Sequence, residues 1–148
     1  MMRYAALTIL LVALLQAPAQ ARAEHSLVLI ASKDSSLQDV NAIDLRKLYL
    51  GFTVVKGDGR PIRAISNFSS PDTWEIFLQD VMGMSERSYN RRLLTLTLQS
   101  GRARPTVHKN LAQLLDHLKS DHDAISFAWS TDIEDRDDIK VLRVLWHH

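Results

Sequence analysis

The sequence of 148 residues contains no cysteine. The chain can therefore form no disulfide bond, cannot carry a lipid on a cysteine at a processing site, and must rely on its hydrophobic core for stability. It also lacks a Gly-x-Ser-x-Gly nucleophile motif, a Walker-type phosphate loop and a dinucleotide-binding glycine pattern. No catalytic residue and no cofactor is predicted from these absences, and we expect that the protein is not an enzyme.

An excess of charge of either sign is missing as well. The chain has 18 lysines and arginines against 17 aspartates and glutamates, which gives a formal net charge of +1. Proteins dedicated to nucleic acids are usually basic, so this balance argues against nucleic acid as a partner.

The first 23 residues have the pattern of a secretory signal peptide. Arg3 precedes the apolar run "YAALTILLVALL", and the small residues of "QAPAQARA" follow it. The apolar run is shorter than the about 20 residues that span a membrane, although a retained anchor helix is the alternative. We expect cleavage after Ala23, or else after Ala21. Residues 24–148 would then form one periplasmic domain that does not insert into the membrane, and its net charge would fall from +1 to −1 because Arg3 and Arg22 are removed.

Hydrophobic periodicity predicts an α/β domain with a mixed sheet flanked by helices. Short apolar runs rich in β-branched residues predict strands at 27–30, 62–65, 124–129 and 139–145. Apolar residues at helical spacing predict four helices, centred on Leu45, Phe77, Leu93 and Leu114. "HKNLAQLLDHLKSD" is assigned to the fourth helix, and "STDIEDRDD" is predicted to be an acidic loop.

The segment "SNFSSPDTWEIFLQDVMG" raises the question of a binding site. Ser70 fits the N-cap of the second helix, and Pro71 fits its first position. Hydroxyl groups of Ser69, Ser70 and Thr73 there, together with free backbone N–H groups, can bind an anion. Pro71 offers no N–H group, and Asp72 either repels an anion or accepts the proton of a hydrogen phosphate. The cluster is therefore predicted to be a helix cap, an oxyanion site, or both.

Basic and histidine side chains give weaker evidence for a binding site than the serine-rich helix start. Arg63, just upstream of the serines, is the candidate to assist oxyanion binding. Arg87, Arg91 and Arg92 are interpreted mainly as a solvated helix face. The histidines and aspartates of "DHLKSDHD" match no familiar zinc spacing, so no metal site is predicted.

The order of five motifs resembles the phosphate-type substrate-binding proteins of ABC transporters, in the type 2 periplasmic binding protein class. The motifs are "LYLGF", "GDGRPI", the serine-rich helix start, "LTLQSGRARP" and "DAISFAW". Together they span most of the chain beyond the signal peptide. The chain departs from the family in length, because it corresponds to one lobe of a two-lobed receptor. It also has Pro71 and Asp72 in a helix start where the family's Ser-Gly-Thr contacts phosphate, and only Thr73 is retained.

The resemblance implies a single-lobe domain of the periplasmic-binding-protein class. The first functional hypothesis is a solute-binding-like protein that holds phosphate or another oxyanion with Ser69, Ser70, Asp72, Thr73 and Arg63. The alternative is a periplasmic interaction or accessory module with a degenerate binding lobe, whose partner is an envelope protein.

Overall fold

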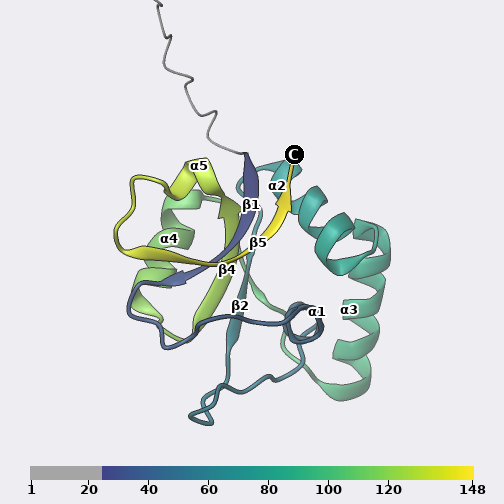
Figure 1. The fold of residues 1–148 in the computed structure, drawn as a ribbon. Coiled ribbons are helices and arrows are strands. Elements are labelled where there is room, and N and C mark those ends of the chain that lie inside the picture. Colours follow the sequence, from purple (N-terminus) through teal and green to yellow (C-terminus); the bar gives the residue numbers. More distant parts are fainter. Residues whose placement is uncertain (1–24) are drawn as a thin grey trace, which may run out of the picture.

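The computed structural model describes residues 25–148, and the predicted signal peptide, residues 1–23, lies outside them (Figure 1). Five strands and six helical segments follow in the order β1 (Ser26–Ser32), α1 (Ala42–Tyr49), β2 (Arg63–Asn67), α2 (Pro71–Ile76), η1 (Phe77–Met82), α3 (Glu86–Ser100), β3 (Thr106–His108), α4 (Leu111–Ser120), β4 (Ala124–Trp129), α5 (Ser130–Ile133) and β5 (Ile139–His147). The element η1 is a π-helix that continues α2. Within this part of the chain, no helix is both long and apolar enough to cross a membrane.

The strands form one mixed sheet, as predicted, and their order in it is β3-β2-β4-β1-β5. Strand β2 is parallel to both of its neighbours, β3 and β4. Strand β1 is antiparallel to β4 and to β5. The carboxyl ends of β2, β3, β4 and β5 therefore lie along one end of the sheet, together with the start of β1. We call this row of strand ends the carboxyl edge, and it is distinct from the outer strands β3 and β5.

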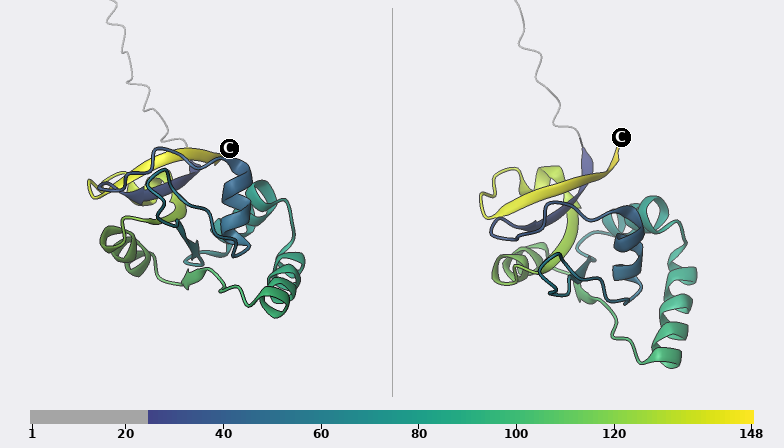
Figure 2. Two further views of the ribbon diagram at one scale, coloured as in Figure 1. Left: turned by 90° about the horizontal axis from the view of Figure 1, so that it is seen from below. Right: turned by 60° about the horizontal axis from the view of Figure 1, so that its bottom comes forward.

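Helices cover both faces of this sheet. In Figure 1, α4 and α5 lie on one side of it and α1, α2 and α3 on the other, and Figure 2 shows α3 standing farthest from the strands. The side chains of β1 alternate between the two cores, because successive residues of a strand point to opposite faces. Leu27 and Leu29 pack with α1, α2 and η1, whereas Val28 and Ile30 pack with α4.

Most predicted elements are confirmed, with three corrections. The fourth helix begins at Leu111 after an Asn110 cap, and residues 106–108 form the short edge strand β3. The acidic loop begins with the one-turn helix α5. The first helix does not bury all of its apolar side chains, because Ile43 is 66% exposed.

Aromatic side chains join α2 and η1 to the sheet. Phe77 is fully buried and stacks on Phe127 of β4, with ring centroids 3.8 Å apart and an angle of 3° between the ring planes. Trp74 contacts both rings and also meets Tyr89 of α3 at 5.2 Å. This cluster determines where the helix that follows the serines lies on the sheet, and both Trp74 and Phe77 are buried in it.

Replacing Phe77 with alanine tests the importance of this cluster. Phe77→Ala is expected to lower the free energy of unfolding by about 3–5 kcal/mol, because it leaves a cavity against Phe127. Urea denaturation of the mature protein measures the loss. Leu98→Ala is the control, since Leu98 is 77% exposed and its truncation should change stability by no more than about 0.5 kcal/mol. A loss below about 1 kcal/mol for Phe77→Ala would contradict the assigned role.

Candidate functional site

The carboxyl edge is the candidate site, because open α/β sheets usually bind ligands just beyond the carboxyl ends of their strands. Helix α2 begins at this edge after β2, and α5 begins there after β4. In Figure 1 this edge is at the top, and the loop that precedes β2 lies at the bottom, at the opposite edge.

The turn from β2 into α2 is held by Asn67, a residue that the sequence analysis did not single out. Its side chain is buried and donates from Nδ2 to the carbonyl oxygen of Phe127, at 2.8 Å. Its Oδ1 accepts from the backbone N–H of Ser69 at 2.9 Å and from the Ser69 hydroxyl at 2.6 Å. The Ser69 hydroxyl is therefore engaged in stabilising the turn. An asparagine directly before a serine-rich helix start is a known turn signal, and it could have been used.

The other three residues of the predicted cluster differ in exposure. Ser70 occupies the N-cap as predicted, but its side chain makes no capping hydrogen bond. Thr73 is buried and only 1% exposed. Asp72 is exposed in the first turn, next to Pro71 at the first helical position. The helix start thus presents one partly exposed hydroxyl and one carboxylate to solvent.

The structure separates Arg63 from this cluster. Arg63 begins β2 and the serines follow its end, and a five-residue strand is on the order of 15 Å long. The guanidinium group of Arg63 instead pairs with Asp121, donating from Nε to Oδ2 at 2.6 Å. Proximity in sequence suggested a shared site, but the strand places the two at opposite edges of the sheet.

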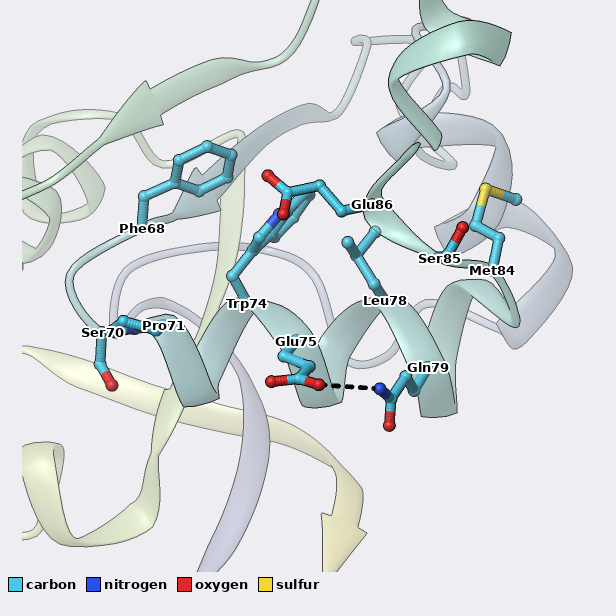
Figure 3. A pocket seen from close by; sticks show the side chains of 10 residues that line it. All are labelled: Phe68, Ser70, Pro71, Trp74, Glu75, Leu78, Gln79, Met84, Ser85 and Glu86. Carbon is cyan, nitrogen blue, oxygen red and sulfur yellow. Dashed lines mark hydrogen bonds between the residues drawn. The ribbon is translucent and has the colours of Figure 1, made fainter. Parts of the chain in front are cut away.

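A groove of about 520 Å³ lies beside α2, η1 and the start of α3 (Figure 3). Ten residues line it: Phe68, Ser70, Pro71, Trp74, Glu75, Leu78, Gln79, Met84, Ser85 and Glu86. Figure 3 shows Trp74 and Leu78 rising into it from the helix, with Phe68 at one end and Glu86 above them. Among the described residues that line it, two are carboxylates and none is lysine, arginine or histidine.

A second, shallower hollow lies at the same edge. Asp72, Glu75, Trp129 and Trp146 line it together with Ile76 and two histidines. The two indole rings meet edge to face at 5.8 Å. Glu75 borders both hollows, so carboxylates and aromatic rings dominate the surface around α2.

Two of the arginines of α3, Arg91 and Arg92, line a different hollow. Ser88 and Thr95 line it with them, and Met84 is the one residue that it shares with the groove. The Thr95 hydroxyl donates to the carbonyl oxygen of Arg91 within the helix.

Comparison with known proteins supports the fold. No protein-family model and no curated protein sequence matches the chain. Among solved structures, it is similar to an ABC-type phosphate transport receptor from Vibrio cholerae, at 12% identity and a TM-score of 0.58. It is also similar to PstS from Borrelia burgdorferi, at 12% identity and a TM-score of 0.55. Both alignments cover 80% of this chain and 46% of the other chain.

The fold is therefore that of the phosphate ABC transporter substrate-binding proteins, which the order of sequence motifs had predicted. The chain spans less than half the length of these structures. At this level of identity the similarity defines the fold alone, and the use of the carboxyl edge has to be argued from its own residues.

Two serines at helix starts give a matched test of capping. Ser85→Ala is expected to lower the free energy of unfolding by about 0.5–2 kcal/mol, because the Ser85 hydroxyl accepts from the backbone N–H of Ser88. Ser70→Ala is expected to cost less than Ser85→Ala, because its hydroxyl makes no such bond. Thermal and urea denaturation of both variants measures the difference, and equal losses would show that Ser70 caps α2 in solution.

The ion pair at the opposite edge of the sheet is expected to make the stability of the fold depend on pH. The pKa of Asp121 lies below its usual value of 3.8, mainly because Arg63 hydrogen-bonds its carboxylate. The resulting stabilisation is present above about pH 4 and is lost as the pH falls below the unfolded-state pKa toward the lowered one. Asp121→Asn should therefore reduce stability at neutral pH and flatten its decline below about pH 4.

Denaturation curves at several pH values test this dependence. Asp80→Asn is the control, because Asp80 is exposed and forms no ion pair within residues 25–148. Parallel acid declines for Asp121→Asn and the unaltered protein would argue against the contribution of this pair.

Proposed function

We propose that the chain is an exported periplasmic domain of the substrate-binding-protein fold, with residues 1–23 as signal peptide and residues 24–148 as its single lobe. The charged start, the short apolar run and the small-residue exit of the N-terminus support export. The similarity to less than half of two phosphate-receptor structures supports the single-lobe assignment.

We propose further that this lobe is an interaction or accessory module, which recognises an envelope protein at the carboxyl edge. The charge of the groove beside α2 is the observation that carries this proposal. Its two carboxylates, Glu75 and Glu86, repel an oxyanion, and no cation among the described lining residues compensates them. The Ser69 hydroxyl is held by Asn67, and Arg63 is held by Asp121 at the other edge.

Phosphate or a related oxyanion is the second candidate ligand. The observation that favours it is the partly exposed Ser70 hydroxyl at the start of a helix, in a fold shared with proteins named as phosphate receptors. Asp72 would have to accept the proton of a hydrogen phosphate for this site to work, and such binding would weaken as the ligand loses that proton.

Site-specific photo-crosslinking in the periplasm of the native host tests the first candidate. A photoreactive amino acid at Gln79, on the groove, is expected to capture a discrete protein adduct. The same amino acid at Gly57 is the control, because Gly57 is exposed in the loop at the opposite edge, with open space around it. No adduct from Gln79, or equal adducts from both positions, would contradict recognition at the carboxyl edge.

Calorimetry of the mature protein separates the two candidates. The acidic lining predicts no heat with millimolar phosphate or sulfate. Saturable heat with the unaltered protein, and an affinity at least about tenfold lower for Asp72→Asn, would favour the oxyanion site instead. A hydrogen bond to a charged group contributes roughly 1.5–3 kcal/mol, which corresponds to such a loss of affinity.

A further inference from the structure

The groove beside α2 contains a buried hydrogen-bond donor that is not used within the described chain. Trp74 is 6% exposed, and its indole Nε1–H has no hydrogen-bond partner among residues 25–148. Buried donors of this kind are nearly always paired in folded proteins. In Figure 3 the indole nitrogen is on the upper side of the groove, where the carboxylate of Glu86 lies in front of it. This unpaired donor belongs to one of the residues that line the groove.

The two carboxylates of the groove are likewise without cations. Neither Glu75 nor Glu86 forms an ion pair with another residue in the range 25–148. The Glu75 carboxylate accepts from Gln79 Nε2 at 3.1 Å, which orients it on the outer face of the helix (Figure 3). The groove is thus electrostatically complementary to a cationic group.

Apolar side chains make up the rest of the lining. Phe68 lies 4.5 Å from the indole of Trp74, and Leu78 and Met84 continue the lining toward the other end of the groove (Figure 3). The flexible methionine can adapt to different apolar groups. The volume of about 520 Å³ is within the range of about 300–1,000 Å³ that is typical of ligand sites. An apolar side chain and a neighbouring cationic side chain fit such a site together.

We infer that the groove binds an extended peptide segment of the partner protein, with a lysine or arginine next to a large apolar residue. Every peptide unit has a carbonyl oxygen, which can accept a hydrogen bond from the Trp74 Nε1–H. The basic side chain pairs with Glu75 and Glu86, and the apolar side chain enters between Phe68, Leu78 and Met84. This inference rests on the proposed recognition of an envelope protein at the carboxyl edge.

Selection from a phage-displayed library of random heptapeptides on the immobilised mature protein tests the inference. The enriched peptides are expected to have lysine or arginine beside leucine, isoleucine, phenylalanine or methionine. Resynthesised peptides are then measured by fluorescence anisotropy. The double variant Glu75→Gln, Glu86→Gln should bind them at least about tenfold more weakly, and Trp74→Phe about twofold to tenfold more weakly.

A control variant with the same change in net charge makes this comparison specific. Glu134→Gln combined with Asp135→Asn removes two exposed carboxylates that line none of the hollows described above, and its peptide affinity should stay within about twofold of the unaltered protein. Circular dichroism and the melting temperature establish that each variant is folded. If Trp74→Phe does not fold, the glutamate double variant still tests whether peptide binding depends on the groove.

Three outcomes would overturn the inference: no enriched peptide, enriched peptides without a basic residue, or equal weakening by both double variants. The photo-crosslink at Gln79 separates this failure from that of the proposed function. A persistent Gln79 adduct with neutral or acidic peptides would leave partner recognition standing and refute the basic segment. Loss of both the adduct and the enrichment would refute both.

Discussion

The stack of Phe77 on Phe127 is the contact on which the candidate site depends. It joins the helix that follows the serines to a central strand of the sheet, and Trp74 extends the stack toward Tyr89 of α3. Trp74 belongs to this cluster with its ring faces and to the groove with its Nε1–H edge. The packed core therefore sets the position of this buried donor, which has no hydrogen-bond partner among residues 25–148.

The turn before α2 uses its polar groups for its own stability. Asn67 joins this turn to β4 and occupies the Ser69 hydroxyl, while Pro71 presets the first helical residue without offering an N–H group. A site that must surround an oxyanion needs such donors free. In this turn the Ser69 hydroxyl is bonded within the chain and Pro71 contributes no N–H group, so fewer donors point to solvent than the serine-rich sequence suggests.

The sequence predicted elements that depend on local signals. Asn41 and Ser85 cap their helices, as asparagine and serine at such positions favour, and four of the five strands lie where apolar runs placed them. Strand β3 was missed because its three residues are largely exposed at the edge of the sheet and form no apolar run. Ser70 was placed correctly, but whether its hydroxyl bonds the helix depends on its rotamer, which sequence does not determine.

The groove was harder to predict than the elements that form it. Its residues all fall between Phe68 and Glu86, yet only the turn at Gly83 and the contact of Trp74 with Tyr89 of α3 place Trp74 and Glu86 in one groove. Arg63 shows the converse, because a residue close to the serines in sequence is removed from them by the length of β2. Helix and strand geometry, rather than composition, decides which neighbours in the sequence share a surface.

Although the net charge is nearly neutral, the two ends of the strands differ in how their charges are paired. At the amino edge of β2, Lys56 pairs with Asp123, and Arg63 pairs with Asp121. These cations form ion pairs with nearby carboxylates, including Asp58 and Asp123. They therefore do not neutralise the negative charges of Asp72, Glu75 and Glu86 at the carboxyl edge. Charges beyond about 10 Å are largely screened at physiological salt. These ion pairs therefore leave the two carboxylates of the groove beside α2 unneutralised, and this local charge, rather than the net charge of the chain, faces a molecule that enters the groove.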